Sequence, residues 1–107
     1  MTRERLPNRR IANSLDLEFD GLRFAVTVGI YPDGRPGEVF THGVKVGSAM
    51  DAILDDACVV VSRLLQHGVE PADLARSMGR LGDRTSPASI IGAVVDLTAT
   101  LAAEVRP

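Results

Sequence analysis

The chain has 107 residues, of which 45% are hydrophobic and 24% charged, and its formal net charge is −2. This length accommodates one hydrophobic core, and the small net charge excludes a general electrostatic attraction to nucleic acid or anionic membranes. The single cysteine, Cys58, excludes a disulfide framework and a cysteine-rich zinc site and fits a reducing cytoplasm. Because no apolar run reaches the ~18 residues of a membrane span, we expect a cytoplasmic protein that does not enter the membrane.

Residues 1–14 are expected to form a basic arm that precedes one folded domain, residues 15–107. The arm carries four arginines against a single acid. Such a terminal segment is more often a solubilising or docking arm than a grip on nucleic acid, because it offers no aromatic side chains among its arginines. Arg9 and Arg10 are nevertheless its candidate contacts with a phosphate or an acidic partner.

A β-hairpin is predicted near the start of the domain. Residues 15–20 and 22–30 alternate apolar and polar side chains, and the Asp-Gly pair between them favours a two-residue type I′ turn. The resulting register places Glu18 opposite Arg23 on the solvent face. Residues 38–42 have the pattern of a third strand, so we expect an antiparallel meander.

Helical spacing of apolar residues predicts a central helix from Ser48, ended by Gly68. Met50, Ile53, Leu54, Ala57, Val61, Leu64 and Leu65 are expected to face the sheet, and Ser62 and Gln66 to face solvent. A short second helix is expected from Pro71 to about Gly79.

A third helix is predicted from Ser86, with Pro87 in its first turn, to about Glu104. Its only charge before Glu104 is Asp96, so it is apolar around most of its circumference. We therefore expect it to be covered by more than its own sheet or by another subunit. The candidate interface, for a homodimer or a larger enzyme subunit, consists of Ala93, Asp96 and Thr100. The predicted fold class is α+β, a three-stranded antiparallel meander followed by three helices packed on one face.

Few residues suggest chemistry. His42 and His67 have no spacing typical of a metal site, and Cys58 in the middle of a helix is more plausibly a small buried side chain than a reactive thiol. We expect no catalytic residue, metal or cofactor. Arg76 and Arg80 are spaced to share a helix face and could hold a phosphate or an acidic partner, although a solvated face is the plainer interpretation.

Four segments together resemble a known family. They are residues 33–40 (D-G-R-P-G-E-V-F), 44–47 (V-K-V-G), 64–74 (L-L-Q-H-G-V-E-P-A-D-L) and 85–90 (T-S-P-A-S-I). They are similar to the TSCPD domain, which lies near the C-terminus of adenosylcobalamin-dependent ribonucleotide reductases and also occurs in small free-standing proteins. The likeness runs from about Leu15 to Leu97.

The resemblance implies a fold more than a chemistry. In the reductase-linked form, cysteines stand in the family motif itself, near the hairpin and after a glycine-spaced loop, which in this chain is residues 43–47 and continues as Ser48-Ala49. Here the motif remnant is Thr85, Ser86 and Pro87, and a serine cannot act as a thiolate ligand or exchange disulfides.

The function that the resemblance implies is therefore a non-catalytic accessory or binding module related to ribonucleoside-diphosphate reductase. It would be linked to deoxyribonucleotide metabolism and DNA synthesis, with oxidoreductase activity a property of the larger family members. One alternative is a nucleic-acid-associated protein that grips phosphate through the arm and Arg76/Arg80. Another is a small enzyme of unrecognised type, for which the sequence offers no nucleophile and base pair.

Overall fold

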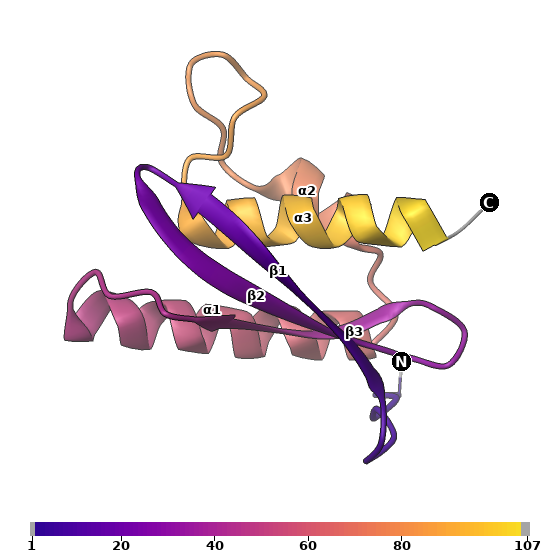
Figure 1. The fold of residues 1–107 in the computed structure, drawn as a ribbon. Helices are drawn as coiled ribbons and strands as arrows, with labels where there is room; N and C mark the ends of the chain where they lie inside the picture. Colours follow the sequence, from indigo (N-terminus) through magenta and orange to yellow (C-terminus); the bar gives the residue numbers. More distant parts are fainter. Residues whose placement is uncertain (1, 106–107) are drawn as a thin grey trace.

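The computed structural model describes residues 2–105. An antiparallel sheet in the order β1-β2-β3 precedes all the helices (Figure 1). The strands are β1 (Ile11–Phe19), β2 (Leu22–Ile30) and β3 (Pro36–His42), and the helices are α1 (Ser48–Gln66), α2 (Pro71–Ser77) and α3 (Ile90–Val105). The predicted α+β class, a meander followed by three helices, is confirmed.

The β1–β2 hairpin has the predicted register. Asp20 and Gly21 both have positive φ (51° and 78°), as a type I′ turn requires. Glu18 faces Arg23 across the strands, with 3.5 Å between the charged groups. Strand β1 begins at Ile11, four residues before the predicted start. The reason is that its pairing with β2 extends as far as the pair Ile11 and Ile30.

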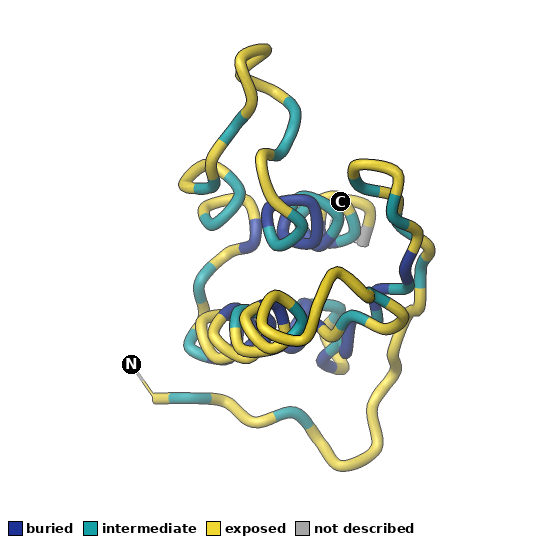
Figure 2. The backbone as a smooth tube through the Cα atoms, turned by 90° about the vertical axis from the view of Figure 1, so that its left-hand side faces the viewer, coloured by how far each residue is buried: buried dark blue, intermediate teal, exposed yellow. Residues whose placement is uncertain are grey.

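The helices form a layer on one face of the sheet. Figure 2 looks along α1 and α3, which lie side by side, while α2 packs on α3. Both α1 and α3 begin near the tip of the β1–β2 hairpin and run in the same direction (Figure 1). The core between the layers consists mainly of branched aliphatic side chains: Val26, Val28, Val39, Leu54, Val61, Leu65, Val94 and Val95. Within residues 2–105, no helix has both the length and the apolar character needed to cross a membrane.

Helix α1 covers the outer edge of β3 with a row of polar side chains. Spaced four residues apart on the helix, Ser62 and Gln66 bond to alternate residues of the strand, Val39 and Gly37, and the Cys58 thiol lies beside Thr41. The spacings agree because four helical residues rise about 6 Å and two strand residues about 6.6 Å. The Ser62 hydroxyl accepts the Val39 N–H at 2.9 Å, and the Gln66 amide donates to the Gly37 carbonyl at 3.0 Å.

This row corrects the predicted orientation of α1. Leu54, Val61 and Leu65 are buried as predicted, but Met50, Ile53 and Leu64 are exposed. Ser62 and Gln66, predicted to face solvent, are buried. The physical reason is that the edge of β3 presents N–H and C=O groups that apolar side chains could not satisfy. The helix therefore turns its polar positions toward the strand.

The predicted limits of the helices need smaller corrections. The third helix begins at Ile90 rather than Ser86, because the Ser89 hydroxyl accepts the Gly92 N–H at 3.0 Å and so caps the first turn. Pro87 instead forms an isolated β-bridge with Arg80. The predicted stop of α1 at Gly68 is confirmed: this residue has φ of 90° and lies just past the last helical turn.

Replacing Ser62 by alanine should lower the free energy of unfolding by about 1–3 kcal/mol, because the buried Val39 N–H loses its acceptor. Urea denaturation followed by circular dichroism measures this change. Ser77→Ala is the matched control, since its hydroxyl is exposed and bonds only to a carbonyl of its own helix. The control should stay within ~0.5 kcal/mol of the parent. Equal stabilities of the two variants would contradict the role given to Ser62.

Candidate functional site

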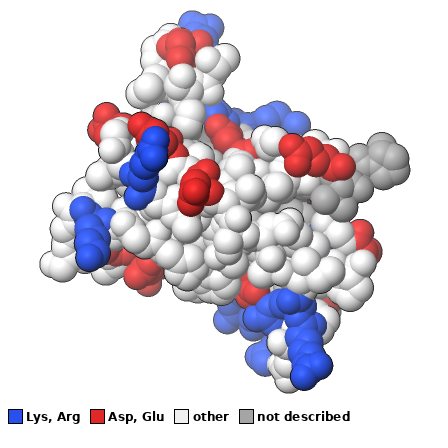
Figure 3. Space-filling view, in the orientation of Figure 1, with Lys and Arg blue, Asp and Glu red and all other residues white. Residues whose placement is uncertain are grey.

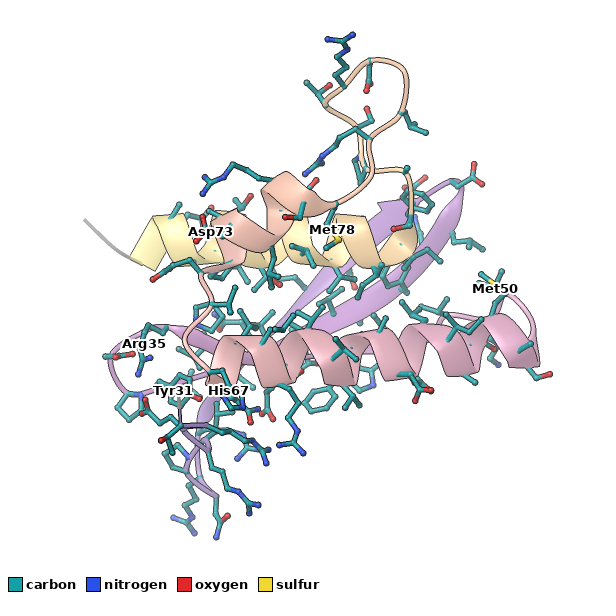
Figure 4. The ribbon with its side chains drawn as sticks, turned by 180° about the vertical axis from the view of Figure 1, so that it is seen from behind. Tyr31, Arg35, Met50, His67, Asp73 and Met78 are labelled. Carbon is teal, nitrogen blue, oxygen red and sulfur yellow. The ribbon has the colours of Figure 1, made fainter. Side chains whose placement is uncertain are left out.

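The two longest family-like segments meet at one end of the molecule, called here the arm end, together with the N-terminal arm. Figure 4 shows Tyr31 and Arg35, from the β2–β3 turn, near His67 at the end of α1. The Tyr31 hydroxyl donates to the Glu4 carbonyl, and the Arg35 guanidinium lies 3.0 Å from the Glu4 carboxylate. The Glu4 N–H donates to the Gln66 carbonyl at 2.8 Å. These contacts fasten the arm to the end of α1.

Gly37, in the first of these segments, is required by close packing. A Cβ at this position would lie 2.6 Å from the Tyr31 ring and 3.0 Å from Leu6. The segment therefore serves to seat the arm, which is a structural role.

The arm is also held by Arg10. Its guanidinium forms a two-pronged ion pair with the Glu38 carboxylate, whose side chain is nearly buried on β3. Glu38 lies across Gly29, where a Cβ would overlap its carboxylate. Of the two candidate contacts in the arm, Arg10 is thus engaged within the chain, while Arg9 is exposed.

Arg80 has a structural partner as well. Its guanidinium donates to both carboxylate oxygens of Asp96 and to the carbonyls of Ala75 and Thr85. Hydrogen bonding to Asp96 raises the pKa of Arg80. One side chain thereby connects the end of α2, the α2–α3 loop and the middle of α3.

Arg76 does not share a helix face with Arg80, because α2 ends at Ser77. It is exposed and forms an ion pair with Asp73 on its own helix. The arm and the α2–α3 loop also lie at different ends of the molecule (Figure 1), and Lys and Arg side chains form separate groups on the face seen in Figure 3. The structure therefore does not bring Arg9 and Arg10 together with Arg76 and Arg80.

The candidate interface on α3 is only partly accessible. Ala93 is 6% exposed, so it is covered within the single chain. Asp96 pairs with Arg80, and the exposed Thr100 hydroxyl donates to the Asp96 carbonyl at 3.1 Å. The apolar circumference of α3 that suggested a subunit contact is covered by α1, α2 and the sheet.

The motif remnant lies in a loop organised by Asp83. Its carboxylate accepts the N–H groups of Thr85 and Ser86, at 3.0 Å and 2.8 Å, and the Ser86 hydroxyl. Ser86 and Pro87 also line one side of a shallow groove with Ala93 and Asp96. Ser86 is thus part of a loop-stabilising network.

A more apolar groove lies beside the tip of the hairpin, and we call it the tip groove. It has a volume of about 340 Å³. Its lining comes from the hairpin, from α1 and the loop before it, and from the start of α3 and the loop before that: Phe19, Asp20, Leu22, Val46, Met50, Ile53, Leu54, Ala57, Ala88, Ser89, Ile90 and Ile91. Figure 4 shows Met50 at the opposite end of α1 from His67. Asp20 is the only charged side chain in the lining.

The tip groove continues along α1 as a row of outward-facing apolar residues, the α1 seam: Val46, Met50, Ile53, Ala57, Val60 and Leu64. Met50, Ile53 and Val60 are 53%, 60% and 58% exposed. The spacing of the seam, alternately four and three residues, is that of helices that pack lengthwise against another helix. The same spacing in the sequence could have identified it, but the neighbouring buried row has this spacing too.

No site for a metal or a reactive thiol is evident within residues 2–105. No three His, Cys, Asp or Glu side chains in this range lie close enough to hold a metal ion. His42 is exposed at the end of β3, and His67 follows α1. Burial raises the pKa of the Cys58 thiol, which keeps it protonated beside Thr41.

Arg80→Ala should lower the free energy of unfolding more than Arg76→Ala does, because Asp96 and the carbonyls of Ala75 and Thr85 lose their donor. Arg76→Ala removes only an exposed ion pair and should cost less than ~0.5 kcal/mol. Thermal and urea unfolding of both variants test this difference. A larger loss for Arg76→Ala would show that Arg80 does not have the structural role described.

Ser86→Ala should raise the pKa of Asp83 toward its ordinary value of 3.8 from about 2, the value set mainly by the Ser86 hydroxyl and then by the N–H groups of Ser86 and Thr85. Because the folded value is below the ordinary one, the bonds to Asp83 favour the loop above pH 3.8 and are lost as the pH falls through about 2. Carbon NMR of the carboxyl group against pH measures the shift. Ser89→Ala, which alters a helix cap without touching Asp83, should leave this pKa unchanged.

Part of this chain is similar in sequence to segments of three bacterial proteins. "Vitamin B12-dependent ribonucleotide reductase" of Rhodopirellula baltica is 40% identical over 67 residues, which are 63% of this chain and 6% of the reductase. The proteins of the same name from Agrobacterium fabrum and Bradyrhizobium diazoefficiens are 36% and 34% identical over 67 residues, and 5% of each is covered. The chain thus spans about one-twentieth of the length of these relatives. No solved structure matches it significantly.

The model of the TSCPD domain family matches residues 6–99. This range includes the whole sheet, α1, α2 and most of α3. The chain therefore belongs to the TSCPD domain family.

Proposed function

We propose that this chain is a non-catalytic docking module, which binds an apolar helix of a larger enzyme of deoxyribonucleotide synthesis through the α1 seam and the tip groove. The proposal includes a cytoplasmic location, in agreement with a single cysteine that is buried as a thiol. This chain covers 6% of the Rhodopirellula baltica reductase, so the proposal assigns it none of the activity of that protein.

The observation that carries the proposal is the exposed α1 seam. Monomeric soluble proteins rarely leave large apolar side chains next to one another in water, and such a surface is typical of an interaction site. Spacing of four and three residues suits a helix that lies along α1, and the groove at one end would receive the end of that helix.

The family resemblance supports the same interpretation. The cysteines of the reductase-linked form are expected near the hairpin, after the glycine loop and at the motif, and in this chain those segments surround the hairpin tip. Ser48 and Ala49 follow the glycine loop, and Ser86 stands in the motif. An apolar groove at the same end of the molecule favours binding over thiol or metal chemistry here.

A double substitution in the seam tests the proposal. Ile53→Glu with Val60→Glu should abolish binding to a vitamin B12-dependent ribonucleotide reductase from which the segment similar to this chain has been removed. Both side chains are exposed, so the variant should fold and keep the circular dichroism spectrum of the parent. Isothermal titration calorimetry measures the loss of affinity, which should exceed about 100-fold if two apolar anchors leave the contact.

Val59→Glu is the matched control. Val59 is 56% exposed on the same helix but lies off the seam, so this variant should bind like the parent. Equal binding by the seam variant and the parent would contradict the proposal. Retention of the parent on DNA in a salt-sensitive manner, without affinity for the reductase, would favour the nucleic-acid alternative instead.

A further inference from the structure

One edge strand of the sheet is covered by a helix, and the other is open. The outer edge of β3 is covered by the polar row of α1, in which Ser62 bonds to Val39. The outer edge of β1 has no strand or helix bonded to it within residues 2–105. Strand β1 also lacks the proline, lysine and bulge that proteins use to keep an edge from pairing.

The turn geometry identifies which backbone groups face outward. Phe19 and Leu22 flank a two-residue turn, so they exchange hydrogen bonds, and such pairs alternate along an antiparallel ladder. The odd-numbered residues of β1 therefore point their N–H and C=O groups at β2. The even-numbered residues point theirs away from the sheet: Ala12, Ser14, Asp16 and Glu18.

The side chains of β1 are arranged so that the strand complements itself. Its first half carries no acid and follows the basic arm, whereas its second half carries Asp16 and Glu18. On the face toward the helices, Ile11 is 70% exposed because the helical layer does not reach it, while Leu15 is half-buried. Two such strands are compatible in charge only when they run antiparallel, since a parallel pair would place the acidic ends side by side.

We propose that β1 pairs with β1 of a second copy of this chain, about a twofold axis at Asn13, to form one continuous six-stranded antiparallel sheet. In this register Ile11 lies opposite Leu15 of the second copy, and the acidic pair Asp16 and Glu18 of one strand lies at the opposite end of the contact from that of the other. Small residues, Ala12 and Ser14, face each other in the hydrogen-bonded positions, so the backbones approach without obstruction. The proposal is independent of the docking function assigned to the α1 seam, which lies on a different element.

Ala12→Pro tests the pairing with little effect on the single chain. The N–H that proline removes points away from β2, and proline is tolerated at such a position of an edge strand. In sedimentation equilibrium from 1 to 200 µM, roughly the range in which weak dimers dissociate, the parent should be a dimer. The variant should dissociate at least ~100-fold more readily, because two symmetric hydrogen bonds are lost. Its circular dichroism spectrum, recorded at a concentration where both proteins are monomeric, should match that of the parent.

Ala12→Ser, which keeps the amide, is the control and should remain dimeric. Hydrogen exchange provides a second measurement: the amides of Ser14 and Asp16 should be protected in the parent at high concentration and exchange rapidly in Ala12→Pro. A parent that is monomeric at 200 µM, roughly the upper end of this range, would overturn the proposal. A dimer that Ala12→Pro does not weaken would overturn it as well, because the contact would then lie elsewhere. If Ala12→Pro fails to fold, unprotected amides of Ser14 and Asp16 in the parent would by themselves rule the pairing out.

Discussion

The contact between α1 and the edge of β3 is the constraint on which the remaining features depend. A strand at the edge of a sheet leaves polar backbone groups that must be satisfied or exposed to water. In this chain, Ser62 and Gln66 satisfy them from a helix, so α1 occupies the place where a fourth strand would pair. The rotation of α1 about its own axis follows from this contact. That rotation in turn decides which of its two apolar rows enters the core and which faces solvent.

Local patterns were sufficient to predict the hairpin and the order of the elements. The Asp-Gly turn and the alternation around it determine one register, and no other part of the chain competes for it. The orientation of α1 could not be predicted in the same way. Two rows with similar spacing run along this helix, and the predicted inward face combines residues of both: Leu54, Val61 and Leu65 are buried, whereas Met50, Ile53 and Leu64 are exposed. Ser62 and Gln66 are polar, so the sequence predicts that they face solvent. They are buried because the backbone groups of β3 need hydrogen-bond partners.

The candidate arginines illustrate a similar limit. The local sequence makes Arg10 and Arg80 candidate contacts to a phosphate or an acidic partner, but each has a carboxylate partner far away along the chain, at Glu38 and Asp96. No local pattern reports such pairs. The resemblance to the family was the more informative signal, although its most distinctive segments, around Gly37 and His67, prove to seat the N-terminal arm. The apolar surface at the other end of the molecule was visible in the sequence only as ordinary helical periodicity.

The fastening of the arm has a consequence for how this domain can be attached to other polypeptides. The first described residues lie beside the end of α1, and α3 also finishes away from the hairpin tip (Figure 1). A longer chain joined at either side would therefore extend away from the tip groove and leave its mouth open. Such a geometry lets the same fold serve as a terminal extension of a large protein or as a separate subunit without rebuilding its apolar face. Fusion tags or fluorescent labels can accordingly be placed at either end without obstructing the hairpin tip.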